Sequence, residues 1–318
     1  MKLVFLERES LGMDVDVSCF EEFGEVTTYD TIDRSRLAEY IREADIVLCN
    51  KAPLTGDVLA QAPHLKVIGE MATGFDNIDI DYCREHGIAV ANAGHYSTES
   101  VAQHTFALAL YLLNQMAYYD QVVKSGEYTR SGKFTIFDAT VTELSGKTWG
   151  IVGMGEIGRR VAKIAEAFGC HVVFFSASGK STCTEYERLE WEVFLAQSDI
   201  ISLHCPLSDR TRHLMNAEAF ARMKKSAILI NVARGPVVDQ EALYQALTSG
   251  QIAGAGLDVL EKEPMQEENP LNLIEDSGRL VITPHMGWAS LQARTNDVVT
   301  TYENVKAFLQ GEKRNRIV

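Results

Sequence analysis

Arg234, Glu263 and His285 are the residues of the sequence whose types and placement best suit acid–base chemistry. Each of them closely follows an apolar, β-rich run of residues. In open α/β sheets, ligands bind in the crevice outside the carboxyl ends of the strands. We therefore expect the three side chains to meet in one crevice.

The three residue types match the reduction of a 2-oxo acid. A guanidinium can hold both the carboxylate and the carbonyl of such a molecule. Hydride that reaches the carbonyl carbon leaves an alkoxide, which an imidazole can protonate near neutral pH. A carboxylate on the other ring nitrogen orients the imidazole and favours its protonated form. The pattern predicts Arg234 as substrate binder, Glu263 as partner of the histidine and His285 as acid/base.

Each of these residues also has a plainer interpretation. Arg234 could be a surface charge, and Glu263 could belong to a solvated acidic stretch, Glu261 to Glu268. His285 could be a turn residue after Pro284. Their joint occurrence at three consecutive strand ends, in the same chain as the glycine loop described next, favours the functional interpretation.

A glycine loop, Gly153-Met-Gly155-Glu-Ile-Gly158, directly follows the apolar run Thr148–Val152 and opens a helical pattern, Arg159–Phe168. The first glycine permits a tight turn, the second lets the backbone approach a diphosphate, and the third lets helix and strand pack closely. The diphosphate then lies on the helix N-terminus, where unpaired N–H groups favour an anion. A tight turn without a ligand is the alternative, but the strand–loop–helix context favours a dinucleotide.

The second strand of this unit, His171–Phe175, lacks the carboxylate that usually closes it and holds a ribose. Ser176 stands there instead, followed by Ser178 and Lys180. Hydroxyls can donate to a 2′-phosphate and Lys180 could offset its charge, although no arginine lies between residues 176 and 180. We expect both NAD and NADP to be used, with a modest preference for NADP.

The elements that must position these residues fall into two groups. Residues 1 to about 97 alternate apolar runs with amphipathic stretches, which predicts a parallel sheet with helices on its faces. The expected strands are Leu3–Leu6, Asp45–Cys49, Lys66–Met71 and Ile88–Ala91, and the expected helices are Asp33–Glu43 and Ile80–His86.

The second group is more regular, with apolar runs that start roughly 25 residues apart and predict a doubly wound sheet. These runs are Thr148–Val152, His171–Phe175, Asp199–Leu203, Ala227–Val232, Ala253–Val259 and Arg279–Thr283. A long apolar helix begins after Ser97, and we expect it to be buried between the domains or against a second subunit. A last amphipathic helix, Ser290 to about Gln310, could close back onto the first domain.

We therefore expect an α/β protein of two doubly wound, parallel-sheet, Rossmann-like domains. Residues 1–97 plus 288–318 would form a discontinuous substrate domain, and residues 98–287 the dinucleotide-binding domain.

Length and composition are consistent with this expectation. The chain has 318 residues, 46% hydrophobic and 23% charged, which excludes a disordered or low-complexity protein. Its 30 Lys and Arg against 44 Asp and Glu give a net charge of −14, which disfavours nucleic-acid and anionic-membrane partners. The first apolar stretch, Leu3 to Leu6, is too short for a signal peptide. The six cysteines are scattered without a Cys-x-x-Cys pair, so we expect reduced thiols, no metal site and a cytoplasmic protein.

The sequence resembles the D-isomer-specific 2-hydroxyacid dehydrogenase family along essentially its whole length. The motifs that carry the resemblance are Ala72-Thr-Gly74-Phe-Asp76-Asn77-Ile-Asp79, Gly153-Met-Gly-Glu-Ile-Gly158, Asn231-Val-Ala-Arg234-Gly-Pro, Gly256-Leu-Asp258-Val-Leu-Glu-Lys-Glu263-Pro and Thr283-Pro-His285-Met-Gly287. Within the family, the segments Asn50-Lys51-Ala-Pro-Leu-Thr, Tyr96-Ser-Thr-Glu-Ser-Val-Ala-Gln-His and Trp288-Ala-Ser are most similar to the glycerate dehydrogenase and hydroxypyruvate reductase branch.

The resemblance implies the same roles for Arg234, Glu263 and His285, with hydroxypyruvate or glyoxylate as substrate and a homodimer as the assembly. It also implies substrate-carboxylate contacts near Thr73 and Gly74, and Lys51 is a further candidate cation unless it is a solvated loop charge. The residues that it places at the dinucleotide are Gly153, Gly155, Glu156, Ile157, Gly158, Ser176, Lys180, His204, Cys205, Pro206, Thr211, Val232, Ala233, Asp258, His285 and Gly287.

Two rival functions stay open at this point. Relatives of this fold act as dinucleotide-sensing co-repressors, and retention of Arg234, Glu263 and His285 does not exclude such a regulatory role beside an enzymatic one. Formate oxidation uses similar chemistry, but that family normally pairs the histidine with a glutamine. Glu263 therefore disfavours formate as the substrate.

Overall fold

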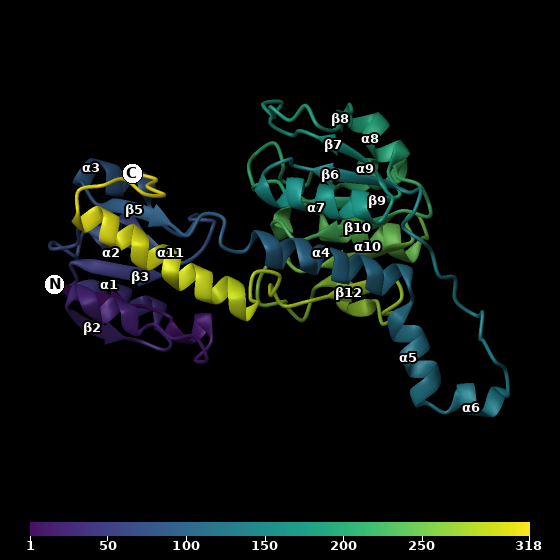
Figure 1. Cartoon of the computed structure of the whole chain (residues 1–318), viewed down its shortest axis with the longest axis horizontal. Coiled ribbons are helices and arrows are strands. Elements are labelled where there is room, and N and C mark those ends of the chain that lie inside the picture. The colour runs from purple at the N-terminus through teal and green to yellow at the C-terminus, as the bar shows by residue number, and fades with distance from the viewer. The chain divides into compact units, whose positions relative to one another are not determined.

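The structure is a computed structural model that describes all 318 residues, and the chain divides into two compact units. The first unit consists of residues 1–97 and 288–318, and the second of residues 98–287 (Figure 1). Each unit is built on an all-parallel sheet, so the predicted fold class is confirmed.

The first unit has a five-stranded sheet in the order β2-β1-β3-β4-β5. Residues of β3, β4 and β5 are buried along their whole length, because helices and loops cover both faces of the sheet. The strands are β1 (Lys2–Phe5), β2 (Glu25–Thr28), β3 (Ile46–Cys49), β4 (Val67–Glu70) and β5 (Ala89–Asn92). The helices are α1 (Leu37–Ile41), α2 (Gly56–Leu59), α3 (Ile80–His86) and α11 (Leu291–Leu309).

Helix α11 comes from the end of the chain and packs on β4 and β5. Gly69 in β4 permits this close approach, since a Cβ there would lie 2.9 Å from the Thr301 side chain. Ser290 caps the helix by accepting a hydrogen bond from the N–H of Ala293. The sequence pattern missed β2, a short edge strand whose residues are mostly exposed and carry no apolar alternation.

The second unit has a seven-stranded sheet in the order β12-β11-β10-β9-β6-β7-β8, so the chain reverses direction across the sheet between β6 and β9. Such a switch point is where doubly wound sheets bind their ligands. The strands are β6 (Thr148–Val152), β7 (His171–Phe175), β8 (Glu187–Arg188), β9 (Ile200–Leu203), β10 (Ile228–Asn231), β11 (Gly254–Leu257) and β12 (Leu280–Ile282). The helices are α4 (Thr98–Leu113), α5 (Met116–Lys124), α6 (Glu127–Ser131), α7 (Glu156–Ala167), α8 (Trp191–Gln197), α9 (Ala217–Arg222) and α10 (Gln240–Thr248).

The apolar helix α4 is buried on one side by its own unit, whereas the sequence pattern led us to expect a cover from the other domain or a second subunit. It packs on α7 and on strands β10, β11 and β12. Gly256 in β11 makes the contact possible, because a Cβ there would lie 2.9 Å from Cβ of Leu108. In the same layer, Phe106 stacks on Phe168 and packs against Trp149 with its ring tilted by 33°.

Candidate active site

The glycine loop between β6 and α7 has the shape that a dinucleotide diphosphate requires. Gly153 has φ = 96°, and a Cβ there would lie 2.9 Å from the backbone of His204 and Cys205. A Cβ on Gly158 would lie 2.1 Å from the carbonyl oxygen of Gly153, whereas a Cβ on Gly155 would meet nothing within 4 Å. The two outer glycines are therefore fixed by packing, and the middle one leaves open space before the first turn of α7, which contains Glu156 and Ile157.

The loop after β7 is contacted by two arginine side chains from other segments of the chain. Ser176 is buried, and its hydroxyl accepts a hydrogen bond of 3.4 Å from the N–H of Ser181. Arg210 donates to the carbonyl of Ser178 over 3.2 Å, and Arg188 donates to the carbonyl of Gly179 over 3.2 Å. Neither arginine could be assigned to this loop from the sequence, because both lie outside it along the chain. Arg188 lies on the two-residue strand β8, and Arg210 lies in the loop after β9.

His204 forms a shielded hydrogen-bonded chain behind the glycine loop. Its Nε2 lies 3.0 Å from the hydroxyl of Ser202, which accepts a 2.8 Å hydrogen bond from the indole of Trp149. Burial lowers the pKa of His204 to about 3, so the ring is neutral at physiological pH. Its Nδ1 is buried without a partner within the chain, which places a polar atom beside the loop that would receive the dinucleotide.

The other residues expected at the dinucleotide serve the local structure as well. Thr211 is buried and donates to the carbonyl of Pro206 over 2.7 Å, which closes the loop that follows Cys205. Ala233 donates its N–H to the side chain of Asn231, and Val232 packs against the core. Lys180 is exposed.

His285 and Glu263 form a close pair. Nδ1 of His285 lies 2.7 Å from Oε2 of Glu263, whose Oε1 accepts a 2.9 Å hydrogen bond from the N–H of Leu260. The carboxylate is thus fixed by its own loop, and it in turn orients the imidazole. The structure brings these two predicted residues together as the sequence pattern expects.

The backbone of His285 is in the left-handed region, with φ = 54°, which is uncommon for a residue other than glycine. Its N–H donates to the carbonyl of Asp258 over 2.8 Å and to that of Thr283 over 2.9 Å. Such strained residues persist only where the surrounding structure holds them, and they cluster at functional sites.

Asp258 provides this support. It is buried and accepts hydrogen bonds from the hydroxyl of Thr283 (2.6 Å) and from the N–H groups of Met286 (2.8 Å) and Gly287 (2.8 Å). Burial alone would raise the pKa of Asp258, but hydrogen bonds from His104, Thr283 and the two N–H groups outweigh it and lower the pKa. Both carboxylate oxygens therefore fix the segment that carries His285. His104 ends one of the segments that resemble the glycerate dehydrogenase branch, but its contact with Asp258 was not expected, because the local pattern does not show that α4 passes along β12.

Arg234 lies between β10 and a 3-10 helix, Gly235–Val237, and its guanidinium donates to the carbonyl of Ala233 over 2.8 Å. The next residue must be glycine, because a Cβ on Gly235 would lie 1.9 Å from the carbonyl of Leu260. This contact brings the Arg234 loop against the loop that contains Glu263. Two of the three predicted strand ends are therefore joined directly through Gly235.

In the first unit, the residues expected to bind substrate lie in loops at the carboxyl ends of β3 and β4. The N–H groups of Lys51 and Ala52 both donate to Oε2 of Glu7 over 2.8 Å, while the side chain of Lys51 is exposed. The hydroxyl of Thr73 donates to the carbonyl of Gly94 over 2.6 Å, next to Gly74. Glu7, itself at φ = 56°, was not singled out by the sequence, because no local motif indicates that its side chain reaches another loop.

Comparison with known proteins gives this geometry a context. Residues 106–287 match the family model described as D-isomer specific 2-hydroxyacid dehydrogenase, NAD binding domain. The chain is 36% identical to a hydroxypyruvate reductase of Blautia hydrogenotrophica, with 99% of both chains covered. It is 38% identical to a glycerate dehydrogenase of Methylorubrum extorquens, with 99% of this chain and 98% of the relative covered. The chain belongs to the D-isomer specific 2-hydroxyacid dehydrogenase family.

Solved structures agree with this assignment. An acyclic imino acid reductase in complex with NADPH and D-Arg superposes with a TM-score of 0.88 at 27% identity, and the alignment covers 100% of both chains. The expected family and its glycerate dehydrogenase and hydroxypyruvate reductase branch are thus confirmed. A nicotinamide dinucleotide is the cofactor of this family, and the glycine loop fits it.

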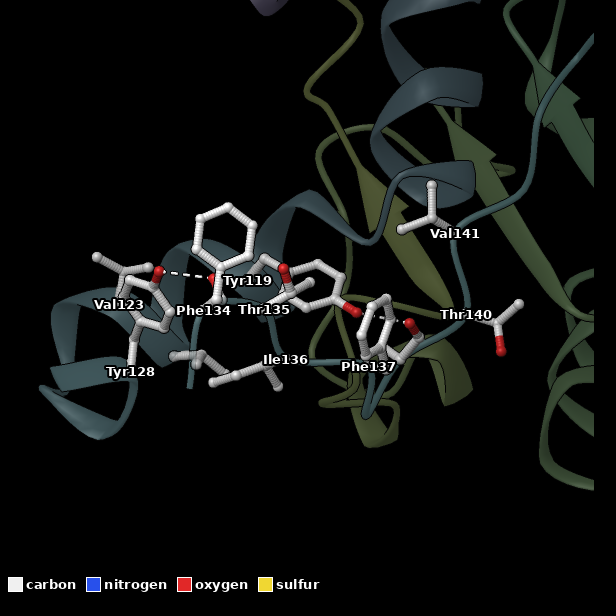
Figure 2. Close-up of a pocket in the computed structure, with 11 residues that line it drawn as sticks. Tyr119, Val123, Tyr128, Phe134, Thr135, Ile136, Phe137, Thr140 and Val141 are labelled. Carbon is white, nitrogen blue, oxygen red and sulfur yellow. Dashed lines mark hydrogen bonds between the residues drawn. The ribbon is translucent and has the colours of Figure 1, made fainter. Parts of the chain in front are cut away.

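A hollow of ≈ 640 Å³ lies in the second unit of this family member, away from the glycine loop and His285, and is lined by α5, α6 and residues 134–141 (Figure 2). Its lining is mainly apolar and aromatic, and Phe134 and Phe137 are 96% and 85% exposed. Tyr128 donates to the carbonyl of Phe134 over 2.9 Å, and Tyr119 donates to that of Ala139 over 2.6 Å (Figure 2). None of the residues that line the hollow is a lysine or an arginine.

None of the helices combines the length and the apolar character that a bilayer-spanning segment requires.

Proposed function

We propose that the protein reduces a small 2-oxo acid, hydroxypyruvate or glyoxylate, to the D-2-hydroxy acid with NADH or NADPH. The observation that carries the proposal is the 2.7 Å pair of His285 and Glu263, on a loop packed against that of Arg234. The names of the two relatives, hydroxypyruvate reductase and glycerate dehydrogenase, support these substrates. We include a cytoplasmic location in the proposal, since all six cysteines are free thiols.

The nicotinamide dinucleotide supplies the hydride when it is bound. Arg234 holds the substrate carboxylate and polarises the carbonyl, because its planar fork can donate to two oxygens at once. Glu263 occupies Nδ1 of His285, so Nε2 is the nitrogen that delivers a proton to the carbonyl oxygen as it becomes an alkoxide. Lys51 and the backbone N–H groups near Thr73 and Gly74 would add contacts to the substrate carboxylate. In the oxidative direction, His285 takes the proton back.

A panel of 2-oxo acids, each assayed with NADH and with NADPH, tests the proposal. Turnover of hydroxypyruvate or glyoxylate at rates of order 1 to 10³ per second would support it. Coenzyme binding without turnover of any 2-oxo acid would instead favour the sensing protein. Formate oxidation is disfavoured, because His285 is paired with Glu263 and not with the glutamine that is usual in formate-oxidising enzymes.

We propose that both coenzymes are accepted with a modest preference for NADPH. A 2′-phosphate would meet Ser176, Lys180 and two arginines whose side chains already contact the same loop, Arg188 and Arg210. These arginines supply the type of side chain that the loop's own sequence lacks. No carboxylate at the end of β7 repels the phosphate.

We expect Ser176→Asp to shift the ratio of kcat/KM for NADPH to that for NADH toward NADH by about tenfold or more, because it restores the repulsion. Arg210→Ala should lower kcat/KM for NADPH about tenfold and leave that for NADH within about twofold. Arg222→Ala, which removes an exposed arginine paired with Glu218 within α9, is the matched control. A parent strongly selective for NADH, or an unchanged ratio in Ser176→Asp, would contradict this assignment.

We propose that the protein is a homodimer and that a second copy covers the apolar hollow. Helices α5 and α6 project from the body of the second unit (Figure 1). Tyr128 on α6, together with Phe134 and Phe137 in the segment that follows it, exposes aromatic surface that a lone chain would leave in water. We expect light scattering at micromolar concentration to give twice the subunit mass, and Phe134→Ser with Phe137→Ser to shift the mass toward one subunit. A parent protein with the mass of one subunit would refute the dimer.

A further inference from the structure

Two buried carboxyl groups lie in the first unit, outside the residues given a role above. Glu70 is the last residue of β4, and Asp297 lies on α11, which packs on that strand. Both residues are 0% exposed. Carboxylic acids are almost never fully buried unless they are paired, so their presence here needs a physical reason.

Each group is only half satisfied by the chain. Oε2 of Glu70 accepts hydrogen bonds from Sγ of Cys49 (3.0 Å) and Nδ2 of Asn77 (3.2 Å), and Oδ1 of Asp297 accepts one from Thr301 (3.4 Å). Oε1 of Glu70 and Oδ2 of Asp297 are buried without a partner. The pKa of each group is raised to about 8, mainly by burial, and for Glu70 the neighbouring Asp297 is a smaller contribution to that rise. Both carboxyls are therefore mainly neutral at pH 7.

The pair is connected to the loop that carries Lys51. Nδ2 of Asn77, which donates to Glu70, also donates to the carbonyl of Ala52 over 3.0 Å. The charge of Lys51 lowers the pKa of Glu70 and of Asp297, so the ammonium lies within electrostatic reach of both. The influence is mutual, because an ionised carboxylate weakens the positive potential around Lys51 by the same interaction.

The other titratable groups around the pair do not replace Lys51 as a counter-charge. Cys49 on β3 is a neutral thiol, since burial raises its pKa well above the usual value and the charges of Glu70, Glu7 and Cys83 add to this. Glu7 is acidic and not a cation, and its side chain accepts hydrogen bonds from the N–H groups of Lys51 and Ala52. Ionisation of Glu70 or Asp297 would therefore add negative charge beside Glu7 and Cys49, neither of which can neutralise it.

We propose that Glu70 and Asp297 are a proton-coupled pair of positioning residues, which in their neutral form keep the Lys51 loop in place and positively charged for the carboxylate of the substrate. When either group loses its proton to solvent at alkaline pH, the potential at Lys51 falls and the anionic substrate binds more weakly. The inference rests on the proposed function in one respect, namely that Lys51 contacts the substrate.

The test compares the parent with Glu70→Gln and Asp297→Asn, singly and together, since each amide mimics the neutral carboxyl. KM and kcat for hydroxypyruvate are measured from pH 6.5 to 9.5. We expect KM of the parent to equal that of the double variant within about twofold at pH 6.5 and to exceed it by about threefold to tenfold at pH 9, with kcat changing in parallel. Every variant keeps the same catalytic residues, so the ratio of the parent's KM to that of the double variant isolates the effect of Glu70 and Asp297. Glu43→Gln, which removes an exposed carboxylate of the same unit, should follow the parent.

A second measurement does not need turnover. Calorimetric titration with oxalate, a dicarboxylate that can neither accept nor donate hydride, is done at pH 8 in buffers of different ionisation enthalpy. It should show more proton uptake by the parent than by the double variant, or by either single variant if the double does not fold. Equal proton uptake, or a KM that rises equally in parent and variants, would overturn the inference. If no variant turns over a 2-oxo acid at pH 6.5, the proposed function fails, and the calorimetry still decides whether the pair couples to anion binding.

Discussion

His285→Ala is expected to lower kcat for the reduction of hydroxypyruvate by roughly 10²–10⁴, the usual range for the loss of a general acid. The imidazole is held by Glu263 at 2.7 Å and by a backbone that Asp258 and Thr283 fix in the left-handed region. Alanine removes the proton donor without leaving a charge unpaired in the interior, because the side chain of Glu263 is 36% exposed. The fold should therefore survive, which circular dichroism can verify before the rates are compared.

The chain contains a matched control for this variant. His213 also has a positive φ, 50°, and its Nε2 lies 2.8 Å from a carboxylate oxygen of Glu261. His213→Ala removes the same ring and the same kind of histidine–carboxylate contact from a different loop, at a backbone position with a similar positive φ. It should leave kcat within about twofold of the parent. An unchanged kcat in His285→Ala, or an equal loss in His213→Ala, would remove His285 from its role as proton donor.

The comparison of these two histidines shows what the sequence could predict. The apolar runs placed His285 and Glu263 after consecutive strands, and the parallel sheet then brought them together at one edge. Gly153 and Gly158 were predictable for the same reason, because the need for glycine arises from a local turn and from the strand and helix beside it. Local pattern and topology are sufficient for both.

Contacts between segments distant in sequence were not predictable in this way. The reach of Arg210 to the Ser178 loop depends on how a loop after β9 folds back, and no residue type in either loop encodes it. The apolar period of α11 predicts which face of the helix is buried, but it does not predict a carboxyl group on that face. The position of Asp297 can be related to Glu70 only once the packing of α11 on β4 is known. The sequence pattern predicts no element for residues 114–147, since their exposed aromatic residues follow neither a helix nor a strand period over any length.

Arg234→Lys is the second substitution with a large expected effect. The guanidinium presents several N–H donors in one plane, and one of them is already used by the carbonyl of Ala233 at 2.8 Å, which fixes the direction of the fork. A lysine keeps the charge but can neither make that contact in the same geometry nor donate to a carboxylate and a carbonyl together. We expect KM for hydroxypyruvate to rise about tenfold and kcat to fall about tenfold or more, so that kcat/KM falls by roughly 10² or more.

The separate effects of Arg234→Lys on KM and on kcat distinguish two roles for the guanidinium. If the guanidinium only attracted the anion, KM would rise while kcat stayed constant, because ground state and transition state would lose the same interaction. A fall in kcat as well indicates that the fork also polarises the carbonyl as negative charge develops on its oxygen. Arg222→Lys, in an exposed ion pair with Glu218 on α9, controls for the loss of an arginine elsewhere in the second unit. Near-parental constants for Arg234→Lys on both hydroxypyruvate and glyoxylate would show that the substrate is held by other cations, with Lys51 the first to examine.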